Sequence, residues 1–184
     1  METRQIDVAV IGTGTAGMTA YRAAREHTER LVLIEQEVYG TTCARVGCMP
    51  SKLLIAAAEA AHAVQEASGF GVRAPPAVVD GGAVMSRVRS ERDRFVGFVV
   101  DAVEGWPDVH RVRGRARFIA PGVLQVDEAL RIEAARVVIA TGSHSQVPDG
   151  WREALRERLG LNDDVFEWHA LPESIGVVGA GVIG

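Results

Sequence analysis

The two cysteines of the chain, Cys43 and Cys48, are the side chains best suited to chemistry. A close pair of thiols can exchange electrons as a dithiol and a disulfide, or can bind a metal ion. A metal site would need further ligands, and the histidines of the chain show no zinc-like spacing. The pair therefore favours redox chemistry over metal binding.

The segment that carries the cysteines must depart from a regular helix if the two sulfurs are to form a disulfide. Five residues rise about 7.5 Å along a helix axis, which is beyond the Cα separation of about 7 Å that a disulfide can bridge. Gly47 and Pro50 indicate how this limit is met. Pro50 has no N–H to bond the carbonyl of Val46, so the start of the following helix can be distorted. A disulfide in such a segment is more typical of a catalytic than of a structural role.

The glycines Gly12, Gly14 and Gly17 form a GxGxxG motif between an apolar run and a helix-forming segment. The first glycine permits a tight turn, the second lets the backbone approach a pyrophosphate, and the third lets the helix pack on the strand. The helix N-terminus offers N–H groups and a positive dipole end to the phosphates. Glu35 lies 23 positions after Gly12, where its carboxylate can bind ribose hydroxyls. These residues predict a dinucleotide site, the alternative being a glycine-rich surface turn.

Gly179, Gly181 and Gly184 form a second GxGxxG directly after the apolar run 175–178. Two dinucleotide motifs, with a cysteine pair near the first, predict two cofactors that exchange electrons with a disulfide. Because the second motif ends on the last residue, we expect a longer protein that is truncated here at the first strand and turn of a second nucleotide-binding domain.

The elements that would hold these residues follow from the apolar pattern. The run 6–11 is short and bounded by Gly12, which indicates a buried parallel strand. Residues 15–29 are rich in helix formers, and residues 30–35 return to an apolar run. Strand, glycine turn, helix and strand make a right-handed βαβ unit.

The rest of the chain alternates between helical and strand-like patterns. We expect helices over 51–67, 84–103 and 151–158, strands over 110–119, 123–126, 135–140 and 175–178, and a loop over 69–79. The short strands after residue 107 predict a β-meander, which ends at Thr141 and Gly142 in the manner of a chain leaving a sheet beside a ligand. The predicted fold class is therefore α/β, a Rossmann-like domain with a parallel sheet and a β-meander.

Charge and hydropathy limit the classes of partner. The chain has 24 acidic and 20 basic side chains and a net charge of −4, which does not suit general nucleic-acid binding. Its apolar runs are far shorter than the roughly 20 residues of a membrane span, and residues 1–7 lack the pattern of a secretory signal. We expect a soluble, cytoplasmic protein that binds neither nucleic acid nor membrane.

Two groups of arginines are interpreted as solvated surfaces. The first group alternates with less polar residues and predicts a single strand with one solvated face, the alternative being a specific anion site. It consists of Arg111, Arg113, Arg115 and Arg117. The second group, Arg87, Arg89, Arg92 and Arg94, is expected on the solvated side of the helix 84–103.

The segment from Gly40 to Lys52, GTTCARVGCMPSK, resembles the redox segment of the class I, FAD-dependent pyridine nucleotide-disulfide oxidoreductases. The common form in that family is Gly-Gly-Thr-Cys, two variable residues, then Val-Gly-Cys-Ile-Pro-Ser-Lys. The first GxGxxG, the motif Ala140-Thr141-Gly142 and the second GxGxxG also occur in the family's order. The resemblance therefore covers the whole chain, and it is nearest to the dihydrolipoamide dehydrogenases.

The resemblance implies FAD as the cofactor and a role for each matched residue. The three glycines of the first motif would bind the FAD pyrophosphate, and Glu35 the adenosine ribose. Cys48 would face the flavin and Cys43 the substrate. The other implied contacts with FAD are Thr42, Lys52 near the reactive flavin nitrogen, Ala116 at the adenine end, and Thr141 with Gly142 closing over the cofactor.

The function implied is electron transfer between a small, lipoamide-like dithiol or disulfide substrate, the cysteine pair, FAD and NAD(P). The family resemblance also implies a homodimer for the full-length protein. The chain alone lacks the family's acid–base pair and is expected to be inactive. The alternatives are a mercuric or glutathione-type disulfide reductase, or a flavin-binding module without turnover.

Two positions depart from the family pattern. Thr41 replaces the usual second glycine, and Arg45 stands where asparagine is frequent in the lipoamide enzymes, which weakens the assignment of the substrate.

Three domain segments are expected. They are an FAD-binding domain with the redox disulfide over 1–145, a linker over 146–174, and the start of an NAD(P)-binding domain over 175–184.

Overall fold

The computed structural model of the chain describes residues 2–181 and 183. The chain divides into two compact units that are interleaved in sequence. The first unit contains residues 2–42 and Val96–His144. The second unit contains Cys43–Phe95, residues 145–181 and residue 183. The predicted segment boundaries at residues 145 and 174 stay predictions.

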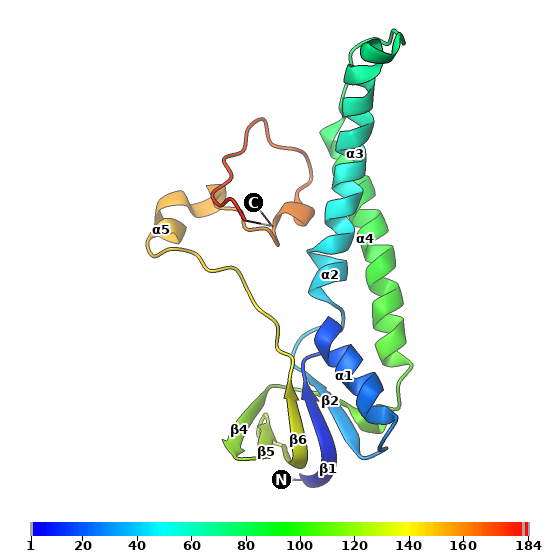
Figure 1. Cartoon of the computed structure of the whole chain (residues 1–184). Helices are drawn as coiled ribbons and strands as arrows, with labels where there is room; N and C mark the ends of the chain where they lie inside the picture. Colours follow the sequence, from blue (N-terminus) through cyan, green and yellow to red (C-terminus); the bar gives the residue numbers. More distant parts are fainter. Residues whose placement is uncertain (1, 182, 184) are drawn as a thin grey trace. The chain divides into compact units, whose positions relative to one another are not determined.

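Helices and strands cover most of the chain up to residue 139, and Figure 1 labels the larger ones. The elements are β1 Glu2–Ile11, α1 Thr15–Arg25, β2 Leu31–Glu35, α2 Thr42–Arg45, α3 Cys48–Glu66, η1 Ala67–Phe70, α4 Gly81–Glu104, η2 Asp108–His110, β3 Arg111–Arg113, β4 Ala116–Ala120, β5 Val123–Val126, β6 Leu130–Ile139, α5 Trp151–Leu155, η3 Arg156–Arg158 and η4 Val165–Glu167. No helix among residues 2–181 and 183 combines the length and hydropathy that a membrane crossing requires.

The first unit is built on a six-stranded sheet with the order β3-β2-β1-β6-β5-β4. β1 pairs in parallel with β2 and β6, and β2 pairs in parallel with β3. β5 pairs antiparallel with β4 and with β6. The predicted α/β class, with a mainly parallel sheet and a β-meander, is confirmed.

The central strands bury side chains on both faces of this sheet. Along β1, Ala9 joins one apolar cluster and Val10 the other; along β2, Val32 and Leu33 divide in the same way. This division follows the two-residue period of a strand. Burial on both faces is typical of parallel strands and explains why their sequences are continuous apolar runs.

The predicted strand 110–119 is wrong as a single element. Its residues form β3 and β4, which stand at opposite ends of the strand order although only Gly114 and Arg115 separate them. The sheet therefore curves back on itself, and Gly114 makes the crossing with φ 144°, a conformation that favours glycine. Val112 and Ala116 both contact the same apolar cluster. Because the alternation continues across the break, the sequence pattern could not reveal it.

Helix α1 ends at Arg25, four residues before the predicted end. The hydroxyl of Thr28 donates to Asp7 Oδ2 over 2.6 Å and accepts from the N–H of Arg30 over 3.0 Å. A threonine that bonds nearby groups in this way competes with helix continuation. The turn that results delivers the chain into β2.

A cluster of two buried rings, Tyr21 and His110, and the partly buried Trp106 joins α1 to the segment before β3. The Tyr21 hydroxyl lies 2.9 Å from His110 Nδ1, and His110 Nε2 lies 3.0 Å from the carbonyl oxygen of Glu29. Because that carbonyl only accepts, Nε2 donates to it, and in the neutral imidazole Nδ1 then accepts from the hydroxyl of Tyr21. The Tyr21 ring stacks on Trp106 with centroids 4.0 Å apart.

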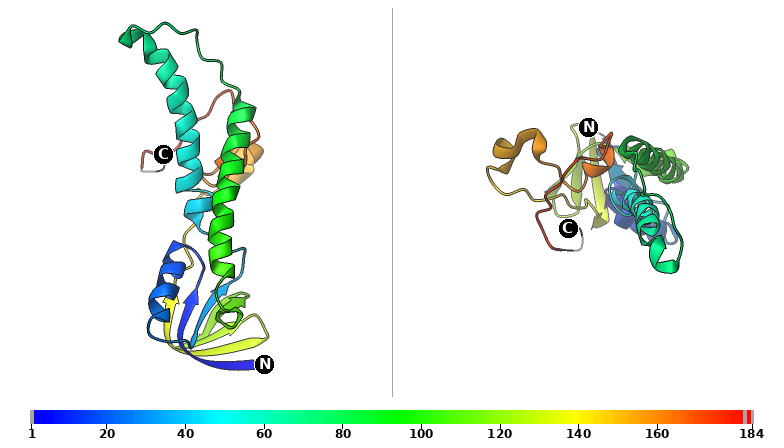
Figure 2. Two further views of the ribbon diagram at one scale, coloured as in Figure 1. Left: turned by 90° about the vertical axis from the view of Figure 1, so that its right-hand side faces the viewer. Right: turned by 90° about the horizontal axis from the view of Figure 1, so that it is seen from above.

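In the second unit, α3 and the portion of α4 up to Phe95 lie side by side and antiparallel (Figure 2). Arg87 of α4 donates from Nη1 to the carbonyl oxygen of Leu53 in α3 over 3.2 Å. The helix predicted over 51–67 begins three residues earlier, at Cys48, and ends at Glu66. Pro50 is tolerated there because N–H groups of the first turn have no helical partner.

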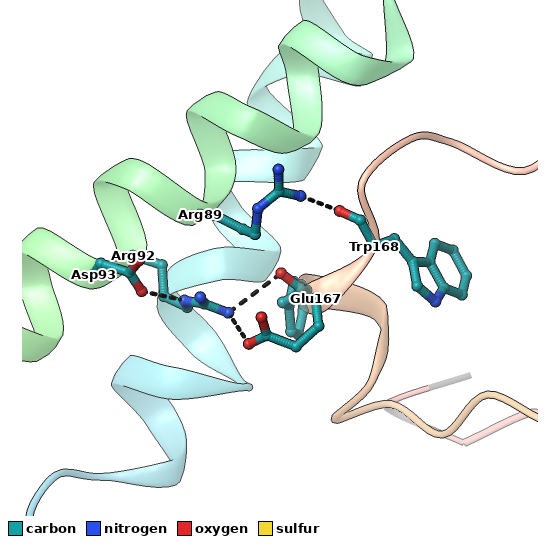
Figure 3. Close-up of polar contacts among 6 residues, drawn as sticks. Arg89, Arg92, Asp93, Glu167 and Trp168 are labelled. Atoms are coloured by element: carbon teal, nitrogen blue, oxygen red, sulfur yellow. Dashed lines mark hydrogen bonds and ion pairs between the residues drawn. The ribbon is translucent and has the colours of Figure 1, made fainter.

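Arginines of α4 hold the segment around η4 (Figure 3). Arg92 is only 7% exposed, because it shares a face of the helix with the buried Met85 and Val88. It donates to the Phe166 carbonyl over 3.2 Å and forms an ion pair with Glu167.

Two further residues of α4 lie close to this segment. Arg89 donates to the Trp168 carbonyl (Figure 3). Gly81 lies so close to Leu171 that a Cβ placed on Gly81 would be 3.0 Å from the backbone N of Leu171. The expectation that the arginines of this helix form its solvated side is therefore wrong for Arg92.

The strand predicted over 175–178 does not form among the described residues. Ile175 and Val177 are each 63% exposed, and the stretch has no regular secondary structure. A strand needs a neighbour for its N–H and C=O groups, and no described strand pairs with this stretch. An apolar run predicts burial, but the partner strand has to be supplied by the rest of the fold.

Candidate functional site

The loop between β1 and α1 has the geometry that its three glycines require. Gly12 has φ 101°, and a Cβ there would lie 2.3 Å from the carbonyl oxygen of Ala140. A Cβ on Gly17 would lie 1.9 Å from the carbonyl oxygen of Gly12, so only glycine lets α1 approach the loop this closely. By contrast, a Cβ on Gly14 would meet nothing within 4 Å. The space beside Gly14 is therefore open, as the approach of a phosphate group requires.

Gly14 is also the residue that precedes helix α1. Its backbone is extended, with φ −71° and ψ −173°, and no side chain caps the helix. The first N–H groups of a helix have no partner within it and carry the positive end of the helix dipole. The open space and these N–H groups together form a cradle that fits a pyrophosphate.

Glu35 at the end of β2 is tied to this loop. Its Oε2 accepts the backbone N–H of Thr13 over 2.9 Å and the Thr13 hydroxyl over 2.7 Å. Its Oε1 accepts the N–H of Glu37 over 3.1 Å. The carboxylate predicted to bind ribose thus also holds the glycine loop in place through its hydrogen bonds with Thr13.

The end of β6 lies beside the same loop. The N–H of Ala140 donates to the carbonyl of Ile11 over 2.8 Å. A Cβ on Gly12 would lie 3.4 Å from Thr141 Cα, and Gly142 has φ 73°. The structure therefore brings Thr141 to the loop, with Gly142 next to it in the chain, and both residues are exposed. Their contact with FAD stays a prediction.

Ala116 begins β4 and packs against the apolar cluster formed by the curved sheet. It is half-buried, and it lies only three positions after Arg113, whose partner across the β2–β3 pair is Glu35. Ala116 therefore lies only three residues along the chain from the residue that pairs with Glu35 at the end of β2. Its contact with adenine stays a prediction.

The cysteine segment is interrupted between two helices, as its sequence predicts. Helix α2 ends at Arg45 and α3 begins at Cys48, with Gly47 at φ −133° and ψ −115°, outside the helical region. Both cysteines are present as thiols. The Cys43 side chain interacts with that of Cys48, so the two thiols are neighbours. The break makes a contact that a regular helix would prevent.

The pair also sets the acidity of one thiol. The hydrogen bond to Cys48, followed by partial burial, raises the pKa of Cys43 above its ordinary value. The backbone N–H of Cys48 acts in the opposite direction and is weaker. A disulfide between the two residues stays a prediction.

The remaining predicted residues lie near the thiols in sequence or in the second motif. Thr42 is the first residue of α2, and Lys52 is the fifth residue of α3; both are exposed. Gly179 has φ 131°, and Gly179 and Gly181 each have open space beside the Cα. Gly184 lies outside the described residues. Among residues 2–181 and 183, no group of three or more His, Cys, Asp or Glu side chains could hold a metal ion.

Comparison with known proteins gives the family. Residues 6–184 match the family model of the pyridine nucleotide-disulphide oxidoreductases. The chain belongs to this family. Its curated relatives include a mercuric reductase of Streptomyces lividans, 35% identical over 97% of this chain and 38% of that protein. They also include dihydrolipoyl dehydrogenase 2 of Haloarcula marismortui, 33% identical over 99% of this chain and 39% of that protein.

The solved structures agree with this family. The HOCl-induced flavoprotein disulfide reductase RclA from Escherichia coli matches with a TM-score of 0.61 and 26% identity, over 78% of this chain and 29% of that one. A glutathione reductase of Burkholderia cepacia is 29% identical over the whole of this chain and 40% of its own length.

The comparisons confirm the predicted family and the class of enzyme to which it belongs. The chain spans about two-fifths of the length of the curated relatives it matches. The relatives carry names with different substrates at similar identity. The family is therefore established, whereas the substrate is a matter for proposal.

Sequence reasoning missed Thr13, Tyr39 and Arg113. Thr13 is fully buried and bonds Glu35, and its hydroxyl inside the glycine motif was the available signal. The guanidinium of Arg113 lies 4.6 Å from the centroid of the Tyr39 ring. No sequence pattern relates these last two residues, since Tyr39 lies in the loop after β2 and Arg113 lies in β3, and they meet only because β3 pairs with β2.

Proposed function

We propose that this chain binds FAD and forms the flavin and dithiol portion of a dihydrolipoamide dehydrogenase-like oxidoreductase. The observation that carries the redox proposal is the contact between the Cys43 and Cys48 side chains across the helix break. Membership of the pyridine nucleotide-disulphide oxidoreductase family supports it. In the whole enzyme, electrons would pass between the substrate, the cysteine pair, FAD and NAD(P).

The chain's own residues fit the dinucleotide. Gly12, Gly14 and Gly17 would hold the pyrophosphate in the cradle before α1, where the space beside Gly14 is open. Glu35 would bind the adenosine ribose with the lone pair of Oε1 that the N–H of Glu37 leaves available, because Oε2 already accepts two hydrogen bonds from Thr13. Bound FAD supplies a two-electron carrier.

The cysteine pair would exchange electrons with substrate by thiol–disulfide chemistry. In the reducing direction, the Cys43 thiolate attacks one sulfur of the substrate disulfide and releases the other as a thiolate. Cys48 then attacks Cys43 in the mixed disulfide, which releases the second substrate thiolate and forms the Cys43–Cys48 disulfide. Two electrons pass to the substrate, and the protein pair is oxidised.

The finer features of this proposal concern the whole protein. A lipoamide-like substrate is supported by the named dihydrolipoyl dehydrogenase relatives and by the form of the Gly40–Lys52 segment. We propose NAD(P) as the electron partner, a homodimer as the active assembly and the cytoplasm as the location. The 184-residue chain alone is expected to bind FAD without catalysing turnover.

A direct test is to purify the full chain, add FAD and record its visible spectrum. We expect a yellow protein whose bound flavin is reduced by dithiothreitol, but which does not turn over NADH with lipoamide. Colourless protein that cannot be reconstituted with FAD contradicts the cofactor proposal. Thiol titration of oxidised, denatured protein should yield two further thiols after reduction, and no gain would exclude the disulfide.

A second candidate is a mercuric reductase-type enzyme, because the Streptomyces lividans protein, 35% identical, matches this chain about as well as dihydrolipoyl dehydrogenase 2 of Haloarcula marismortui, 33% identical. Both candidates use the same flavin and dithiol portion. Oxidation of NAD(P)H with Hg²⁺ rather than with lipoamide, by a protein that contains this chain, would select the second candidate.

A further inference from the structure

A cationic side chain is held in place beside Glu35. Arg113 of β3 pairs in register with Glu35 of β2, at the edge of the sheet. Its guanidinium carbon lies 4.6 Å from the centroid of the Tyr39 ring. Tyr39 is only 8% exposed, whereas Arg113 is exposed. The guanidinium therefore covers the ring and remains accessible to a ligand.

Glu35, Arg113 and Tyr39 lie on the same side of the sheet. The preceding register pair, Ile34 and Val112, points into the cluster enclosed by the curved sheet. Because successive side chains of a strand alternate, Glu35 and Arg113 point to the opposite side. Tyr39 belongs to the apolar cluster on that opposite side. Adjacent strands are about 4.8 Å apart, so a base attached to a ribose on Glu35 is within reach of Arg113.

We propose that Arg113, held on the Tyr39 ring, is the platform on which the adenine base of the bound dinucleotide stacks. A guanidinium is planar and stacks on aromatic rings and on nucleic-acid bases. The contact with Tyr39 restricts the guanidinium before the ligand arrives, which lowers the entropic cost of binding. The proposal rests on the proposed FAD function and adds a side chain that stacks on the adenine base.

The test compares FAD with FMN, which shares the flavin but has no adenosine. Equilibrium binding to the full chain is measured by quenching of flavin fluorescence for the wild type, Arg113→Ala and Arg113→Lys. Arg117→Ala is the matched control, since Arg117 is also exposed but lies on β4 and donates to Gln125 over 3.1 Å. Thermal unfolding of each variant verifies that it is folded.

We expect Arg113→Ala to weaken FAD binding about tenfold and to leave FMN binding unchanged. Arg113→Lys keeps the charge but loses the plane, and we expect it to recover little of the affinity. Arg117→Ala should bind FAD like the wild type. Unchanged FAD affinity in Arg113→Ala, or an equal loss for FAD and FMN, would overturn the platform.

Titration with ADP separates this proposal from the FAD proposal. If the wild type binds no FAD, the proposed function is wrong, and ADP then tests the platform by itself. Weaker ADP binding by Arg113→Ala supports an adenine platform in either case. Equal ADP binding by the wild type and the variant refutes it. If Arg113→Ala does not fold, Arg113→Lys supplies the same comparison.

Discussion

Thr13 and Glu35 are joined by two hydrogen bonds to a single carboxylate oxygen. The backbone N–H of Thr13 donates to Oε2 of Glu35 over 2.9 Å, and its hydroxyl donates to the same atom over 2.7 Å. Thr13 lies inside the first glycine motif, and Glu35 lies at the end of the next strand. The two hydrogen bonds therefore fix the glycine loop that would bind the phosphates and the carboxylate that would bind the ribose relative to each other.

The hydroxyl of Thr13 can be removed with little change in shape by Thr13→Val. We expect the free energy of unfolding to fall by about 1–2 kcal/mol, because a hydrogen bond to a charged, partly buried acceptor is lost. FAD affinity should fall with it, since Glu35 gains freedom. Urea unfolding and flavin titration measure the two effects. Thr13→Ser keeps the hydroxyl and should retain affinity; equal losses in both variants would contradict this role of the hydroxyl.

Substitutions of two glycines of the motif should affect different properties: Gly17→Ala the stability of the fold, and Gly14→Ala the affinity for FAD. Gly17→Ala places a methyl group 1.9 Å from the Gly12 carbonyl oxygen, and we expect it to destabilise the fold by about 3 kcal/mol. Gly14→Ala meets no atom within 4 Å, and loss of the glycine cap costs at most about 1 kcal/mol. FAD affinity of Gly14→Ala should nevertheless fall about tenfold or more, because the methyl group occupies the phosphate approach.

Urea unfolding and flavin titration of these two variants test the separation. If Gly14→Ala binds FAD normally, the cradle does not lie where we place it. If Gly17→Ala is as stable as the wild type, the helix does not need its close approach to the loop.

The reactivity of Cys43 should depend on Cys48 through the hydrogen bond between them. Cys48→Ala removes that bond, so we expect the pKa of Cys43 to fall and its alkylation rate to reach half-maximum at lower pH. Cys48→Ser retains a hydrogen-bonding group and should shift the profile less. The measurement is the rate of iodoacetamide modification against pH. An unchanged profile in Cys48→Ala would mean that the thiols do not interact.

The same pKa has a consequence for stability. A thiol whose pKa is raised by folding contributes stability that is fully present below its ordinary pKa and is lost as the pH rises through the folded value. The reduced chain should therefore lose stability at alkaline pH, and Cys43→Ala should lose less. Urea unfolding midpoints measured across this alkaline range test the sign, and a parallel decline in both proteins would contradict it.

Arg92 should hold the segment around η4 on helix α4. In Arg92→Met the Phe166 carbonyl and the Glu167 carboxylate lose their partner, and we expect local stability to fall by about 1–2 kcal/mol. Hydrogen exchange of residues 165–169 reports the change. Arg94→Met is the matched control, because Arg94 is exposed and pairs with Glu91 one turn away on the same helix. Faster exchange in both variants, or in neither, would refute the attachment.

Much of the fold could be predicted because its central strands are buried on both faces. The runs at 6–11 and 30–35 became β1 and β2, and the glycine motif fell between β1 and α1 as expected. The division of 110–119 into two strands could not be predicted, because the residues on both sides of Gly114 keep one alternating pattern. Only strand pairing places these strands at opposite ends of the order.

The candidate site divides in the same way. The sequence by itself determined the glycine loop, the cysteine pair and the helix break at Gly47, because turns, thiols and missing N–H groups act over a few residues. The tertiary structure alone decided that Thr13 bonds Glu35 and that Arg113 covers Tyr39. Contacts of this kind join different elements, so they depend on strand pairing and burial, which local patterns do not encode.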